Sequence, residues 1–142
     1  MIILDTNVIS EVVRPSPSAA VVEWLNVQES AELYVTVITL GELGYGIESL
    51  PRGRRRTNLS VALDRFVDQA FSDRVLAFDR GAARHYGQVM AARRRQGRPM
   101  SVPDGQIAAI ARQHRFQLAT RNTKDFEECE LELINPFDRS GV

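Results

Sequence analysis

The sequence has few of the residues that indicate a disulfide-rich, zinc-binding or membrane protein. It contains one cysteine, Cys129, and two histidines in 142 residues. A single cysteine excludes an intramolecular disulfide, and no cysteine and histidine cluster has zinc-site spacing. No apolar run approaches the roughly 18 residues of a membrane span, and the N-terminus lacks the basic and apolar regions of a secretory signal. We therefore expect a soluble, cytoplasmic protein without a membrane partner.

Lysine is nearly absent, and the net charge is zero. Seventeen of the 18 basic residues are arginine, and they are unevenly placed: residues 52–98 hold twelve arginines against four acids, whereas residues 1–51 hold one against seven. Zero net charge argues against unspecific binding to polyanions. Arginine, however, pairs with phosphate through two hydrogen bonds and stacks on bases. The runs at 52–56 and 93–98 therefore form either a solvated surface or a phosphate-contacting one.

Short apolar runs alternate with helical patterns along the chain. Strands are expected at residues 2–4, 33–38, 75–78, 116–120 and 131–134. Helical spacing of apolar residues is found at 8–13, 18–27, 39–47, 58–70, 80–95 and 103–111. Four or five short strands interleaved with helices predict an α/β fold of three layers, in which a parallel sheet carries helices on both faces. The length fits one domain, residues 1–142.

Four acids, Asp5, Glu42, Asp104 and Asp125, are expected just past the ends of short apolar strands. The carboxyl ends of parallel strands form the crevice where ligands bind, so acids placed there converge. Converging carboxylates raise one another's pKa unless a divalent cation supplies the compensating charge. Oxygen ligands of this kind favour Mg²⁺ or Mn²⁺. The pattern therefore predicts a metal site.

Each acid also has a purely structural explanation. Asp5 and Asp104 fall in first helical turns, where capping and the helix dipole stabilise an anion. Glu42 follows Thr39 at the spacing of a capping box, and Asp125 can cap a short helix. Four independent caps need not all follow strands, however, and an unpaired acid in the apolar surroundings of Asp104 is costly. The metal site is therefore the preferred hypothesis.

Four segments resemble, in order and spacing, those of the PIN-domain ribonucleases. They are IILDTN at 2–7, TLGEL at 39–43, PDGQIAA at 103–109 and ATRNTKDF at 119–126. The sequence looks most like the VapC toxins of bacterial toxin–antitoxin pairs, in their FitB-like branch. This resemblance implies a PIN-like fold and a Mg²⁺- or Mn²⁺-dependent endoribonuclease that is neutralised by a small cognate antitoxin. It also implies a homodimer that forms a heterotetramer or larger assembly with the antitoxin.

The resemblance also implies roles for individual residues. Asp5, Glu42 and Asp104 match the three principal acids of the family, with one or two cations bound between them. The fourth position is either Asp125 or Asn122. Asn122 can ligate a cation through its amide oxygen but supplies no charge, so we favour Asp125 as a catalytic and metal-binding residue.

Other residues match supporting positions. Asn7 and Thr120, together with Asn122, are expected to support the acids without being their main metal ligands. The RNA substrate would meet some of the exposed arginines. The candidates for contact with RNA are Arg93, Arg94, Arg95, Arg98 and Arg121.

Two other functions compete with this one. A small-molecule phosphohydrolase of the haloacid-dehalogenase type needs an aspartate two residues after its nucleophilic aspartate, and Asn7 stands at that position here. This alternative therefore ranks low. The other alternative is a non-catalytic PIN-fold module that binds RNA or a protein partner, for which no cleavage in any divalent metal is expected.

Overall fold

A computed structural model describes residues 1–138, which contain a five-stranded sheet in the order β3-β2-β1-β4-β5. All four strand pairs are parallel. The strands are short, and the predicted segments at 33–38, 75–78, 116–120 and 131–134 all extend beyond them. Their bounds are β1 Ile2–Leu4, β2 Leu33–Thr36, β3 Val75–Leu76, β4 Gln117–Ala119 and β5 Leu133–Ile134.

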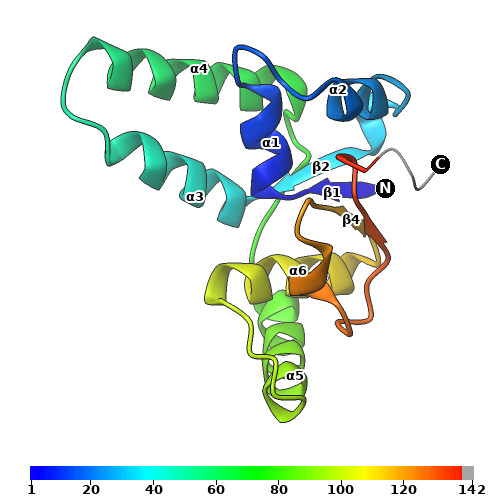
Figure 1. Cartoon of the computed structure of the whole chain (residues 1–142). Coiled ribbons are helices and arrows are strands. Elements are labelled where there is room, and N and C mark those ends of the chain that lie inside the picture. The colour runs from blue at the N-terminus through cyan, green and yellow to red at the C-terminus, as the bar shows by residue number, and fades with distance from the viewer. Residues whose placement is uncertain (139–142) are drawn as a thin grey trace.

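Helices cover both faces of this sheet, as the three-layer prediction requires (Figure 1). The first four α-helices lie on one face, and α5 and α6 lie on the other. The 3₁₀ helix η2 follows β4. The helices are α1 Thr6–Val12, α2 Ala19–Asn26, α3 Val37–Glu48, α4 Arg54–Ala70, α5 Arg80–Arg95 and α6 Val102–His114, with the 3₁₀ helices η1 Ser30–Glu32 and η2 Thr123–Phe126. None of the helices among residues 1–138 is long and apolar enough to cross a membrane.

The alternation of side chains along β1 separates two hydrophobic cores. Ile2 and Leu4 pack with residues of the first helices, whereas Ile3 packs with residues of α5 and α6. This is the period-two pattern of a strand that is buried on both faces. The fold prediction is therefore confirmed at the level of layers and strand direction.

Polar residues cap four of the helices, and the first is Asp5, which caps α1 by accepting a hydrogen bond from Thr6 N. Asp79 caps α5 by accepting a hydrogen bond from Ala82 N, and Ser101 caps α6 by accepting one from Asp104 N. Thr36 caps α3 by accepting one from Thr39 N at 3.2 Å. This last cap corrects the sequence analysis: because α3 begins at Val37, Thr39 lies inside the helix and makes no capping box with Glu42.

The start of α4 differs from the prediction. The arginines at 54–56 form the first turn of α4, which the sequence analysis placed in a turn before residue 58. Arginine favours helices, so the run extends the helix rather than preceding it. At the end of α5, Gly97 has φ +73, the left-handed conformation that glycine commonly adopts just after a helix.

Candidate active site

A pocket of about 390 Å³ opens at the carboxyl edge of the sheet and contains three of the four predicted acids. Asp5 directly follows β1, but Glu42 lies in the second turn of α3 and Asp104 lies in the first turn of α6 after α5. The prediction that all four acids directly follow strands is therefore wrong, because helix starts also carry acids to this edge. The lining residues are Asp5, Thr6, Asn7, Ser10, Glu11, Arg14, Glu42, Asp104, Arg121 and Asn122.

Asp5 is buried at the base of this pocket, with 4% of its surface exposed. Its carboxylate accepts hydrogen bonds from Thr6 N at 2.8 Å, Thr120 Oγ1 at 2.8 Å and Asn7 Nδ2 at 3.2 Å. Burial nevertheless raises the pKa of Asp5 from 3.8 to about 6, and the charges of Asp104 and Glu42 add to this rise. The hydrogen bonds do not offset the loss of water, so Asp5 keeps its proton to a higher pH than an exposed aspartate does.

The pKa of Asp104 is raised as well, and this residue is only partly buried. Its pKa is raised by partial burial first, and by the charges of Asp125 and Glu42 in addition, while Arg93 acts in the opposite direction. Its backbone N–H donates to Ser101 Oγ at 3.3 Å. Ser101 therefore caps α6, and its side chain also hydrogen-bonds the Asp104 carboxylate, which partly offsets the rise in the pKa of Asp104.

Glu42 is exposed at the rim of the pocket. Its Oε1 accepts a hydrogen bond of 2.7 Å from Thr6 Oγ1, which also contacts Thr39 Oγ1 at 3.0 Å. The Thr6 hydroxyl thus holds Glu42 toward Asp5. Within residues 1–138 no three acidic, imidazole or thiol groups stand close enough together to enclose an ion, so a cation shared by Asp5 and Glu42 requires rotation of the exposed Glu42 side chain or bridging water.

The supporting polar residues tie β4 to β1. Thr120 Oγ1, besides donating to Asp5, accepts from Asn122 N at 3.0 Å. Asn7 donates to Thr120 Oγ1 at 3.3 Å, and its Oδ1 accepts from Arg121 N at 3.1 Å. Thr120 and Asn7 therefore fix the Asp5 carboxylate and the turn that carries Arg121 and Asn122.

The two candidates for the fourth position lie differently. Asn122 lines the pocket, whereas Asp125 lies exposed on η2 and outside the lining. Asp125 is nevertheless close enough to raise the pKa of Asp104 by its charge. It lies inside η2, so it is not the cap of that short helix.

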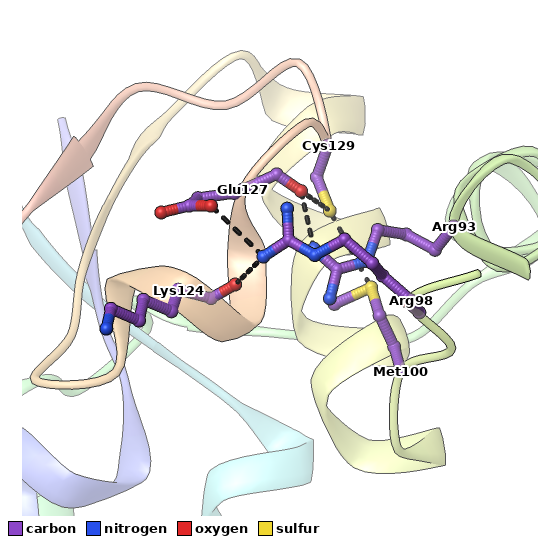
Figure 2. Close-up of polar contacts among 6 residues, drawn as sticks. All are labelled: Arg93, Arg98, Met100, Lys124, Glu127 and Cys129. Carbon is purple, nitrogen blue, oxygen red and sulfur yellow. Dashed lines mark hydrogen bonds and ion pairs between the residues drawn. The ribbon is translucent and has the colours of Figure 1, made fainter. Parts of the chain in front are cut away.

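Arg93 is not a surface residue, so its prediction as an RNA contact is wrong. It is buried, and its guanidinium donates to Arg98 O at 2.7 Å and Glu127 O at 2.6 Å (Figure 2). Arg98 in turn donates to Lys124 O at 3.2 Å and pairs with the Glu127 carboxylate at 3.0 Å. The sequence held a signal for this: Arg93 follows the buried Val89 by one helical turn.

The remaining arginine candidates divide into two groups. Arg94 and Arg95 are exposed on the last turn of α5 and lie outside the pocket lined by the acids. Arg121 lies at that pocket and contacts Glu11 and Phe137. Glu11 and Arg14, which also line the pocket, were not among the predicted site residues. The available signal was an acid at position 11 within the apolar pattern of Val8, Ile9 and Val12.

Without metal, the protein should lose stability as the pH rises from about 4 to about 6. The pKa of Asp5 is about 6 in the folded protein against 3.8 ordinarily, so the folded state binds this proton more tightly across that interval. Ionisation of Asp5 there should lower the free energy of unfolding by up to about 3 kcal/mol. Asp104 acts in the same direction, and Asp79, whose pKa is lowered, titrates below the interval.

Urea unfolding at the two ends of this interval, in EDTA and with Mn²⁺, measures the effect. Mn²⁺ should restore the stability at the higher pH, because a cation binds only the ionised carboxylate. A metal-free stability that rises across the interval contradicts the assignment.

The fold and the pocket together define an α/β protein with an acid-lined site at the carboxyl edge of a parallel sheet. A family model described as PIN domain matches residues 2–130. The chain belongs to the PIN domain family, which confirms the resemblance seen in the sequence.

Named relatives match over nearly their whole length. The chain is 43% identical to "VapC ribonuclease Y4jK" of Sinorhizobium fredii, covering 97% of this chain and 99% of the relative. It is 37% identical to "Toxin FitB" of Neisseria gonorrhoeae, covering 96% and 99%. The solved structure of FitAB bound to a DNA fragment superposes with a TM-score of 0.90 at 36% identity, covering 97% of this chain and 96% of that one.

Proposed function

We propose that this chain is a metal-dependent endoribonuclease and the toxin of a toxin–antitoxin pair. The observation that carries the proposal is the pocket that Asp5, Glu42 and Asp104 all line, with a buried carboxylate whose pKa is raised. Relatives named as a VapC ribonuclease and as a toxin support the substrate class. Hydrolysis of an RNA phosphodiester needs a site of this kind, because charge develops on the attacking, non-bridging and leaving oxygens.

The donor set fits a hard divalent cation, for which we propose Mg²⁺ or Mn²⁺. Asp5 and Asp104 would be its main ligands, and both carry the raised pKa that a bound cation would reverse. Glu42 and, as the fourth acid, Asp125 would complete the site directly or through water. A bound cation supplies two things here: it lowers the pKa of a coordinated water, and it offsets charge on the reacting phosphate.

The chain's own residues hold this site ready. Thr6 N–H and the Thr120 hydroxyl fix the Asp5 carboxylate, and the Thr6 hydroxyl orients Glu42. Asn7 secures the turn after β4 by accepting from Arg121 N. Since these bonds link the start of α1 to α3 and to the turn after β4, Asp5 and Glu42 are held by contacts between separate elements of the fold.

We also propose a cognate small antitoxin as the protein partner. Solved structures of relatives are antitoxin–toxin complexes, some of them bound to DNA. By analogy the protein would act in the cytoplasm as a homodimer, with a heterotetramer or larger assembly in the presence of the antitoxin. The chain would be a single PIN domain over residues 1–142.

Incubation of the purified protein with total RNA tests the activity. Cleavage should occur with Mg²⁺ or Mn²⁺ and stop in excess EDTA, and it should be suppressed when the antitoxin is added. Absence of cleavage in every divalent metal, with a correctly folded protein, would instead favour a non-catalytic RNA- or partner-binding module.

A further inference from the structure

Two arginines at the pocket rim share a single buried carboxylate. Arg14 Nη1 lies 3.3 Å and Arg121 Nη2 lies 3.4 Å from the same atom, Glu11 Oε1. The other oxygen, Oε2, accepts from Ser18 N at 3.0 Å. Glu11 is 5% exposed, so it is held in place by these three donors. The carboxylate therefore fixes two guanidinium groups beside each other.

This cluster carries an excess positive charge that faces the pocket. Two guanidinium groups meet one carboxylate, and both side chains remain more than half exposed, at 63% for Arg14 and 53% for Arg121. All three residues line the same pocket as Asp5 and Asp104. The pocket lining thus contains acids and, beside them, arginines with charge available for an anion.

The Arg121 guanidinium is oriented as well as charged. Its centre lies 3.9 Å from the centroid of the Phe137 ring, and its backbone N–H donates to Asn7 Oδ1. Stacking on Phe137 and contact with Glu11 restrict the plane of the guanidinium. An arginine whose plane is already fixed loses less conformational entropy when it forms paired hydrogen bonds with a phosphate.

We infer that Arg14 and Arg121, organised by Glu11, form a phosphate-binding subsite that holds an RNA backbone phosphate next to the one that is cleaved. The inference rests on the proposed function, since it takes RNA as the ligand. A carboxylate of a protein partner has related chemistry. RNA is favoured because the acids proposed to bind the metal lie in the same pocket. One phosphate of an RNA chain could lie at the metal while the next contacts the two arginines.

The test measures binding of a fluorescent single-stranded RNA by anisotropy in EDTA across a series of KCl concentrations. Arg14→Gln and Arg121→Gln should each weaken binding about tenfold. Each should also reduce the slope of log Kd against log salt by about 0.7, the value for one lost contact with a single strand. Arg121→Lys should keep the slope but bind more weakly, because lysine keeps the charge without the stacked, forked geometry.

Arg84→Gln is the matched control, since Arg84 is exposed on α5 on the opposite face of the sheet from α1. It should leave affinity and slope unchanged. In cleavage assays with Mn²⁺ the Arg14 and Arg121 variants should raise KM with little change in kcat, because the contact is the same in the ground and transition states.

The inference is overturned if both glutamine variants, folded as judged by thermal melting, keep the wild-type slope and affinity. It is equally overturned if they bind RNA normally but lose affinity for the antitoxin, which would assign the subsite to a partner's carboxylate. A failure of the proposed function would give a different result. The wild-type protein would then not cleave RNA in any metal, but the slopes of log Kd against log salt would still show whether Arg14 and Arg121 bind phosphate.

Discussion

Replacement of Asp104 by asparagine is expected to abolish RNA cleavage and leave the fold intact. Even the loss of a residue that only supports a metal ligand reduces metal affinity or activity by about 10- to 100-fold, so loss of a principal ligand should exceed about 100-fold. The fold should survive because Ser101 caps α6 through the backbone N–H of residue 104, and an asparagine oxygen can still accept from the Ser101 hydroxyl. The substitution also removes a carboxylate whose pKa is raised by burial and by neighbouring acids.

The measurements are the initial rate of RNA cleavage, Mn²⁺ binding by calorimetry and the melting temperature in EDTA. Asp68→Asn, at an exposed acid on α4, is the control and should change none of the three. Wild-type cleavage by the Asp104→Asn protein would end the mechanism proposed here. The same assays on Asp125→Asn and Asn122→Ala compare the two candidates for the fourth position, and we expect the larger loss from Asp125→Asn.

Sequence patterns predicted the layers of the fold well because the signals were local. Pro103 in a first turn and Gly97 after α5 mark helix ends through backbone geometry alone, and the buried stripe of α6 follows from its spacing. The start of α3 was misplaced because Val37 and Ile38 are β-branched and continue a strand pattern. The Thr36 cap, which overrides that propensity, is recognisable only once its bond to Thr39 N is seen.

The candidate site was predictable in its acids and not in its arginines. Asp5 and Asp104 stand at element ends, which the order of strands and helices reveals. Arg93 and Arg121 were predicted alike to contact RNA, although Arg93 alone of the two lies in the basic segment 52–98. The two arginines differ in their tertiary contacts. Arg93 is buried and donates to backbone carbonyls, whereas Arg121 pairs with Glu11 at the pocket. A buried arginine is rare, so the surface expectation was reasonable but wrong.

Arg93→Ala is expected to be the most destabilising single arginine substitution among those considered. The buried guanidinium donates short hydrogen bonds to the carbonyls of Arg98 and Glu127. A hydrogen bond from a charged group contributes about 1.5–3 kcal/mol, so the loss of two should lower the free energy of unfolding by about 3–5 kcal/mol. That is a large part of a typical domain's stability.

Arg93→Ala should also change metal binding at the active site. Arg93 and Arg98 hold the carbonyls of Glu127 and Lys124, which flank Asp125 on either side (Figure 2). Arg93 also lowers the pKa of Asp104 by its charge, so its removal should raise that pKa further. That charge effect alone would favour a cation, since a guanidinium repels Mn²⁺. We nevertheless expect Arg93→Ala to weaken Mn²⁺ binding, even at temperatures where the variant remains folded, because η2 and Asp125 lose the contacts that position them.

Two companion variants separate charge from packing. Arg94→Ala, at an exposed neighbour on α5, should change stability by no more than about 0.5 kcal/mol. Arg93→Met keeps much of the side-chain volume but cannot donate to the carbonyls, so it should recover only part of the lost stability. Denaturant unfolding of the three variants measures their free energies of unfolding against the wild type. Equal stability of Arg93→Ala and Arg94→Ala would show that the hydrogen bonds to Arg98 and Glu127 do not hold η2 against α5, and the positioning of Asp125 would then need another cause.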